Sequence, residues 1–464
     1  MKLVLIDVML FLVSAFATIR NGYGAGQPLR AQHALGVQRI LVLAVSFPKV
    51  ELEMSLSQVR EKVIEKTANY YFEASYGKTT LLGELKGWYS LPRPLEDYQV
   101  SPYNIGVDRN KVWRLVEDTL NAAEKDVVLN RYDHIIIVVG VRTGPGVGYG
   151  MMTYSANPGM LTFEGMRHGK ACMQKIRTRG GQHFNGGIIV VAQNCHVGHI
   201  VHDLAHALGG VVKGKRPVPD LYDTVLQGKV GPLSREAYPK FTVFMGPWDV
   251  MSCHYIKYWE PPPGMSSFTR LRMGWIADEQ VVEVTPGETR AVTLGPLGGG
   301  KGILVIKIPG RRNTYYLLEN RQKLPGDPMP PTNGLLLLHV DESKEDGDGI
   351  VQIVDANPKV PDFAEAAFGV SLGQTPSVSL PRDVAVEVLW QRGKDITVLV
   401  TKPSIAPEVQ AVAKRIREID HRLGIIPDSS TTGEARAELT NVMGLLLQLK
   451  INEARSKLDN IEWP

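Results

Sequence analysis

Two histidines one helical turn apart carry the clearest chemical signal in this sequence. His202 and His206 belong to the segment HIVHDLAHALG at 199–209. On a helix, positions i and i+4 lie on one face, so both imidazoles can reach one metal ion of the Zn²⁺ type. The apolar residues between them supply a buried face, and Gly209-Gly210 supplies a stop. Because the chain contains 11 histidines, such a pair also arises by chance, and the prediction depends on further ligands.

A carboxylate and a methionine farther along the chain are suited to complete such a site. Asp220 lies in VPDLYD at 218–223, after a loop rich in Gly, Lys and Pro that can turn back over the metal. An oxygen ligand there would leave a fourth coordination position open for water. Met251 lies in GPWDVMS at 246–252, a turn whose apolar methionine can form the floor of a histidine-rich site.

The segments before and around these residues predict an α/β layer. Unbroken apolar runs are typical of strands buried on both faces, and the last such run directly precedes the two-histidine helix. Apolar residues at 3.6-residue spacing indicate helices, and strict alternation indicates a hairpin. The expected elements are a strand at 39–47, a helix at 57–72, a hairpin at 79–91, a helix at 109–123, and strands at 134–140 and 187–192.

From about residue 278 the pattern changes to short β-rich runs separated by Gly and Pro, which predicts a separate all-β module. A proline-containing linker at 402–407 follows, and apolar residues at helical spacing after it predict a C-terminal helical hairpin. The expected strands lie at 280–284, 290–294, 303–308, 314–319, 334–340, 350–354, 384–390 and 396–400.

The amino-terminal residues have the pattern of a secretory signal peptide. Lys2 precedes an apolar run at 3–17, and Ala15-Phe16-Ala17 offers a small-x-small cleavage site. Asp7 is unfavourable inside such a run, so an uncleaved anchor or an amino-terminal strand is the alternative. We expect an exported protein, extracellular or associated with the cell surface.

Composition excludes several classes of protein. The chain has 464 residues with Lys+Arg 52 against Asp+Glu 48, and a net charge of +4 is too small to suggest nucleic-acid binding by charge alone. Hydrophobic residues at 44% and charged residues at 22% are typical of a globular protein. Beyond the amino-terminal run no stretch is long and apolar enough to span a bilayer, so we expect no transmembrane body.

Several motifs, taken in their order along the chain, resemble those of the immune inhibitor A-like metallopeptidases. The resemblance extends from about residue 37 to about residue 357 and includes the two-histidine helix. Each motif is modest by itself, but their shared order is specific. The other motifs are RILVL at 39–43, YFEASYGK at 71–78, PDLYD at 219–223, WDVMS at 248–252, LRMGW at 271–275, YYLLENRQ at 315–322 and LLHVDE at 337–342.

The resemblance implies a metzincin-like zinc endopeptidase that acts on proteins or peptides. At the matching positions, His202 and His206 would be zinc ligands, Asp220 the third ligand and Met251 the turn methionine. Asp203 would stand where the family has its general-base glutamate. The chain would then divide into a signal peptide at 1–25, a metallopeptidase catalytic domain with an α/β lobe at 26–278, a β-rich module at 279–402 and a helical tail at 403–464.

Two departures from the family pattern leave the activity open. Asp203 is one methylene shorter than glutamate, which withdraws the carboxylate by about 1 Å, and a misplacement of that size can cost about 100-fold in rate. The loop at 210–218 also separates Asp220 from the second histidine by more residues than the family pattern has. The alternative is therefore a weak or inactive pseudopeptidase that serves as an extracellular binding protein. A third interpretation, an intracellular protein without metal, requires both histidines to be satisfied by buried hydrogen bonds.

Other residues have more than one interpretation. Tyr222 and Tyr255 are candidates to stabilise an oxyanion, with plain packing as the alternative. His199 is either an additional ligand or a histidine at a helix end bonded to backbone or solvent. The acidic segment at 341–355 is either a Ca²⁺ site or a solvated loop, since Asp346 and Gln352 break the EF-hand pattern. The tail is expected to dimerise, to dock on the catalytic body or to attach the protein to a surface, and the sequence leaves the oligomeric state open.

Overall fold

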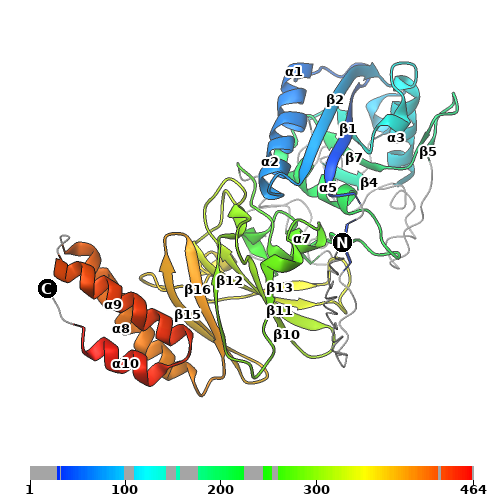
Figure 1. Ribbon diagram of the computed structural model, residues 1–464. Coiled ribbons are helices and arrows are strands. Elements are labelled where there is room, and N and C mark those ends of the chain that lie inside the picture. The colour runs from blue at the N-terminus through cyan, green and yellow to red at the C-terminus, as the bar shows by residue number, and fades with distance from the viewer. Residues whose placement is uncertain are drawn as a thin grey trace, which may run out of the picture.

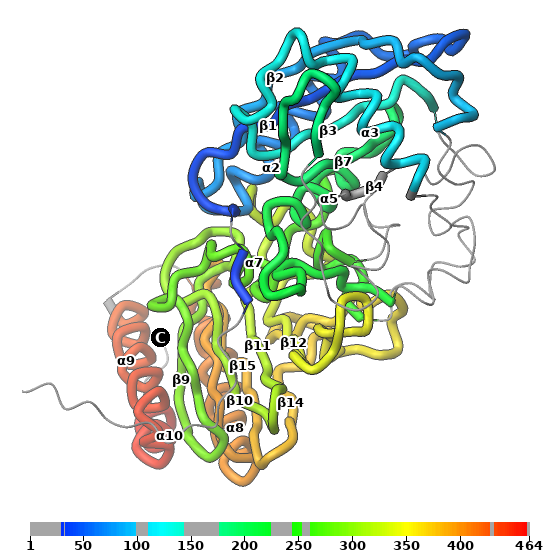
Figure 2. Tube along the Cα trace, turned by 90° about the vertical axis from the view of Figure 1, so that its right-hand side faces the viewer, coloured from blue at the N-terminus to red at the C-terminus, as the bar shows by residue number. Residues whose placement is uncertain are grey.

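The structure is a computed structural model that describes residues 29–31, 33–98, 109–142, 153–156, 176–223, 244–252, 260–426 and 430–461. The predicted signal peptide at 1–25 and Tyr255 lie outside these ranges. The described part is a mixed α/β protein with several sheets and a C-terminal helical region (Figure 1). Figure 2 shows the α/β part above the β-rich part, with the helix α7 (Ser267–Arg272) between them.

The first sheet has five strands, and all neighbouring pairs are parallel except the last. Every residue of β3 and β7, two of the three inner strands, is buried, as the unbroken apolar runs predicted. Neighbouring parallel strands have to be joined by a crossover segment. The helices that alternate with these strands along the chain are such crossovers, as the sequence predicted. The order is β2 (Thr79–Ser90), β1 (Gly36–Ser46), β3 (His134–Val139), β7 (Gly187–Ala192) and β4 (Thr153–Ala156).

Helices cover both faces of this sheet. The helix α3 (Arg109–Ala123) packs on one face through a stripe that includes Leu115, Val116 and Leu120. On the other face lie α2 (Thr67–Ala74), which continues α1 (Leu56–Val59) through a π-helical segment at Arg60–Lys66, and the later helix α5. The predicted helix at 57–72 is confirmed apart from its π-helical centre.

The predicted hairpin at 79–91 is wrong, because these residues form the single strand β2, parallel to β1. Period-two alternation does not distinguish two short arms from one long strand. Gly87 makes no turn here. Its φ is +124°, and a Cβ at this position would lie 2.2 Å from the carbonyl oxygen of Ala44, close to where the pairing register shifts between Leu43 and Val45.

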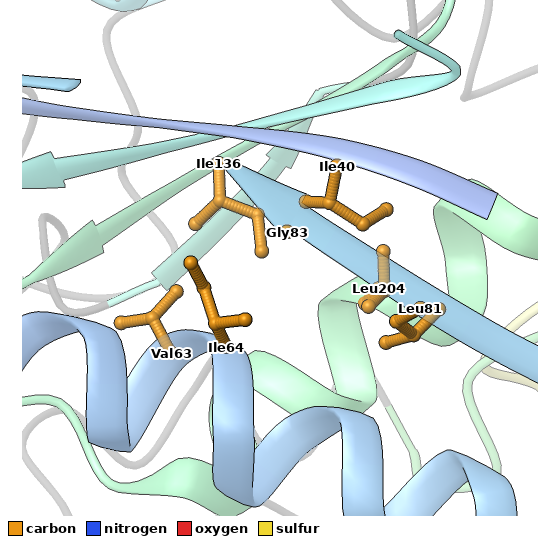
Figure 3. A pocket seen from close by; sticks show the side chains of 7 residues that line it. All are labelled: Ile40, Val63, Ile64, Leu81, Gly83, Ile136 and Leu204. Carbon is orange, nitrogen blue, oxygen red and sulfur yellow. The ribbon is translucent and has the colours of Figure 1, made fainter. Parts of the chain in front are cut away.

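A small void lies between the first sheet and the helices on the α2 face. Figure 3 shows that its walls are aliphatic side chains from the sheet, from the π-helical segment and from Leu204 of α5. Its volume is about 10 Å³ and its lining has no polar side chain, so it suits neither a ligand nor an ordered water. The lining residues are Ile40, Val63, Ile64, Leu81, Gly83, Ile136 and Leu204.

Two further sheets form a sandwich after residue 278. In the second sheet all pairs are antiparallel except β10 with β8, and its order is β13 (Val351–Val354), β12 (Gly334–Asp341), β11 (Thr314–Arg321), β10 (Val305–Pro309) and β8 (Val281–Glu283). The third sheet is antiparallel throughout, in the order β14 (Ser377–Leu380), β15 (Val384–Arg392), β16 (Asp395–Thr401) and β9 (Arg290–Leu294). The expected strands are found to within a few residues. The sequence did not predict β4, β14 or the two-stranded ladder of β5 (Ile176–Arg177) and β6 (His183–Phe184).

The two faces of the second sheet belong to different cores. One face packs against the third sheet, with Leu318 and Leu337 in contact with the core that includes Val386 and Val398. The other face, including Leu317, Leu338 and Val340, joins the same core as α2 and α5. One hydrophobic core therefore continues across residue 278.

The tail has three helices, so the predicted helical hairpin is incomplete. The helices are α8 (Ala406–Ile425), α9 (Ser430–Leu447) and α10 (Ile451–Asp459). Leu449, whose φ is +61°, lies in the break between α9 and α10. The apolar stripes pack against β15 and β16 in one core that includes Leu389 and Leu399, so the tail docks on the third sheet (Figure 1). Among the described residues, no helix combines the length and apolar character needed to cross a membrane.

The burial of Glu387 beneath α8 predicts that the stability of the docked tail depends on pH. Burial raises the pKa of its carboxyl to about 7, and a hydrogen bond from Gln410 of α8 opposes the shift. Between about pH 4.5 and 7 the unfolded chain ionises while the folded chain keeps the proton, so stability falls as pH rises, by up to about 3 kcal/mol. We expect Glu387→Gln to be more stable to urea than the parent at pH 8, with little difference at pH 4.5. The exposed Glu418→Gln on α8 is the control, and an equal gain there would contradict this assignment.

Candidate metal centre

The helix α5 (Val197–Gly209) carries the two histidines out of strand β7 into the interior. His196 caps its start by accepting the backbone N–H of Gly198 at 3.2 Å. At its end Gly210 has φ +64° and ψ −152°, a conformation that only glycine adopts readily. Every residue of the helix is buried, so its polar side chains have to find partners within the protein.

Three side chains converge at the centre of the site. The Nε2 atoms of His202 and His206 lie 3.1 Å apart, and Oδ1 of Asp220 lies 3.0 Å from the first and 3.2 Å from the second. Tetrahedral zinc with bonds of about 2.0–2.1 Å holds its ligand atoms about 3.3 Å apart. The observed triangle therefore fits one face of a zinc tetrahedron within a few tenths of an ångström.

Backbone carbonyl groups fix the direction of both imidazole rings. Nδ1 of His202 lies 3.1 Å from the carbonyl oxygen of Val250, and Nδ1 of His206 lies 2.8 Å from that of Val218. Because a carbonyl oxygen only accepts, each Nδ1 carries the hydrogen. In the neutral rings both Nε2 atoms then present lone pairs toward the Asp220 carboxylate. Three acceptors facing one point favour a positive charge between them, which a metal ion or a ring proton would supply.

Asp203 lies at the same centre. One of its carboxylate oxygens and a ring nitrogen from each of His202 and His206 all lie within 4.8 Å of one another, and all three residues are buried. This buried group could hold a metal ion. A carboxylate in this group could be a further ligand of such an ion, or a base for a water molecule bound to it.

Charge controls the ionisation of the two carboxyl groups around the site. Burial by itself would raise the pKa of Asp220, but His206 and His202 hold that pKa well below its usual value. Asp346, which lies against the backbone of Asp220, has a raised pKa because burial outweighs the attraction of Arg216. Of these two carboxyl groups, Asp220 therefore keeps its negative charge more readily than Asp346.

The turn at Gly246–Trp248 and the residues after it position His202. Met251 is fully buried, and its backbone N–H donates to Oδ1 of Asp249 at 2.8 Å. The Asp249 carboxylate also accepts from the backbone of Ser266 and the hydroxyl of Thr269, which fixes the turn to α7. The carbonyl of Met251 accepts from the backbone N–H of Leu221, next to Asp220. The predicted methionine turn thus connects the first histidine to the carboxylate loop.

The other predicted site residues have different outcomes. The ring centroid of Tyr222 lies 6.3 Å from that of His202, and burial together with Asp220 raises the phenol pKa well above its usual value, so the hydroxyl keeps its proton. His199 is buried one turn earlier in α5 and is not in the convergent group. Apart from the groups that share His202 and His206, no set of three or more potential ligands converges within the described ranges, and the Ca²⁺ site at 341–355 stays a prediction.

Two residues of the site were missed by sequence reasoning. The guanidinium of Arg216 lies 3.5 Å from Nε2 of His206 and 3.6 Å from Oδ2 of Asp220. Asp346, which the sequence showed only as a break in a calcium pattern, contacts both Arg216 and the backbone of Asp220. Asp346 lies 126 positions from Asp220, so no local signal marks that contact, whereas Arg216 lies only four positions before Asp220 and could have been noticed from that spacing.

Comparisons with known proteins add no family assignment, since no protein-family model and no curated protein matches the chain.

Metal content tests this centre directly. We expect the purified chain to bind one equivalent of Zn²⁺, and His206→Ala to lose it because two ligand atoms cannot hold the ion against a chelator. His199→Ala is the matched control, a buried histidine of the same helix, and should retain the full equivalent. Zinc is measured by atomic emission after dialysis, with thermal unfolding of each variant. A full equivalent in His206→Ala would rule out the centre, and loss in His199→Ala would make His199 a ligand.

Proposed function

We propose that this protein is an exported, metzincin-like zinc endopeptidase of the immune inhibitor A-like class, which hydrolyses peptide bonds in proteins. The observation that carries the proposal is the buried triangle of His202, His206 and Asp220, whose sides of 3.0–3.2 Å suit tetrahedral zinc. Three protein ligands leave the fourth position open, as catalytic zinc sites require.

The arrangement around the triangle supports the same proposal. The two-histidine helix follows an inner strand of a largely parallel sheet, and a buried methionine turn holds the first histidine through Val250. The motifs that carry the resemblance also include groups that contact the site: Tyr71 donates to the carbonyl of Val201 in α5 at 2.6 Å, and Arg272 donates to the carbonyl of Pro217 at 3.3 Å. The export signal at 1–25 belongs to this proposal as a sequence expectation.

The site residues would divide the chemistry among them. Zinc bound here would polarise the substrate carbonyl and lower the pKa of a bound water. Asp203 would accept the proton of that water and deliver it to the leaving amine. The protonated phenol of Tyr222 would donate a hydrogen bond to the oxyanion that forms at the carbonyl. Asp220 would stay ionised as a ligand throughout.

The short side chain of Asp203 sets the expected rate. Because its carboxylate is withdrawn by about 1 Å relative to a glutamate, proton transfer is expected to be about 100-fold slower than with a glutamate in its place. Backbone carbonyls orient both histidines, and Asp220 lies within 3.2 Å of each, which supports the remainder of the proposed site. We therefore propose a slow peptidase.

A second candidate function rests on the same residue. If Asp203 cannot reach the water, the protein is a pseudopeptidase that keeps the fold and the zinc and acts as an extracellular binding protein. The apolar stripes of the tail are buried against the third sheet, so in that case the exposed faces of the sandwich or the tail would carry the binding. Activity of Asp203 variants separates the two functions.

Cleavage of an unfolded protein substrate tests the peptidase. We expect slow, chelator-sensitive cleavage that zinc restores, a loss of at least about 100-fold in Asp203→Ala, and a gain of about 10- to 100-fold in Asp203→Glu. The zinc content of each variant shows whether the metal is retained. A parent with full zinc and no cleavage, together with an active Asp203→Glu, would reject the peptidase in favour of the pseudopeptidase.

A further inference from the structure

We infer that the β-rich part of the chain positions the third metal ligand, through a clamp made by Asp346 and Gly347 on Asp220 and Arg216. This inference rests on the proposed zinc site and concerns how tightly that site binds its ion. Asp346 is a positioning residue in this role: it contacts the ligand's backbone and the neighbouring cation, and the triangle is made without it.

The clamp holds the backbone of Asp220 from both sides. Its N–H donates to Oδ1 of Asp346 at 2.6 Å, and its carbonyl oxygen accepts from the N–H of Gly347 at 3.3 Å. With both backbone groups fixed by one loop, the direction of the Asp220 side chain toward the histidines is fixed as well. Asp346 lies 126 positions farther along the chain, in the loop after strand β12.

Asp346 also controls the cation that lies closest to the triangle. Nη1 of Arg216 lies 3.3 Å from Oδ2 of Asp346 and 3.6 Å from Oδ2 of Asp220, and this side chain is only 7% exposed. A buried guanidinium beside a metal position opposes the binding of a dication. The Asp346 carboxylate balances that charge and shares Arg216 with Asp220. Oδ1 of Asp220 then remains directed at the two histidines.

A second set of contacts anchors both sides of the clamp to α7. Arg272 donates to Oε2 of Glu342 at 2.5 Å and to the carbonyl of Pro217 at 3.3 Å. The hydroxyl of Tyr315 donates to Oε1 of Glu342 at 2.8 Å. The loop after β12 and the segment before Asp220 are thus tied to one helix, which lies between the two parts of the molecule (Figure 2). The clamp is held in place by contacts that do not involve the histidines.

The test is the zinc affinity of the full-length chain, measured by competition with a chromophoric chelator. Partners that orient a metal ligand contribute about 10- to 100-fold in affinity, and we expect that loss in Asp346→Ala. Asp346→Asn keeps an oxygen that can accept from Asp220 but loses the charge, so we expect a smaller loss. Asp348→Ala, an exposed aspartate of the same loop, is the matched control and should bind zinc as the parent does.

A double variant separates positioning from a general loss of structure. In Arg216→Ala/Asp346→Ala the unbalanced cation is gone, so we expect zinc affinity to recover part of the loss seen in Asp346→Ala. If Asp346 only supports the fold, the double variant should bind zinc more weakly than Asp346→Ala does. If Asp346→Ala does not fold, Asp346→Asn against the parent decides the question.

Three results would overturn the inference. Zinc affinity in a folded Asp346→Ala or Asp346→Asn within twofold of the parent would show that the clamp does not position the ligand. A further loss in the double variant would show a structural role only. A parent that binds no zinc would overturn the proposed function together with this inference, and this outcome is distinct because it appears before any variant is compared.

Discussion

The candidate metal centre depends on two backbone carbonyl groups, which orient its two histidines. Those of Val218 and Val250 accept from the Nδ1 atoms of His206 and His202, and so turn both Nε2 lone pairs toward the carboxylate of Asp220. Without them the same two histidines could be ordinary core residues that donate to any nearby acceptor. With them, three acceptors face one point in a buried site, and a cation is the simplest way to satisfy all three.

The segments that carry these two carbonyls are held in place by different parts of the molecule. Val250 belongs to the turn fixed by Asp249 to α7, and Val218 to the loop that Arg272 holds from the same helix. The second sheet shares a core with α5 and sends the loop containing Asp346 to Asp220. A rigid position for each ligand therefore requires the first sheet, α7 and the second sheet together.

Asp203 is where the arrangement is least suited to fast chemistry. Its carboxylate lies with the two histidines in one buried group, so burial and position agree with a catalytic role, while its length does not. If the centre binds zinc as proposed, a short base would be consistent with slow turnover, and equally with a zinc site that serves structure alone. The difference between these two outcomes depends on whether the Asp203 carboxylate, one methylene shorter than that of a glutamate, can contact the water molecule.

The sequence by itself determined the local elements and the pair of histidines that could hold a metal ion. Apolar runs and helical spacing are local properties, so they predicted β3, β7, α3 and the helix with His202 and His206. Tertiary structure decided the rest: that 79–90 is one parallel strand, that a third helix completes the tail, and that Arg216 and Asp346 reach the site. These depend on which segments meet in space. A partner 126 residues away leaves no trace in local spacing, because folding alone brings the two together.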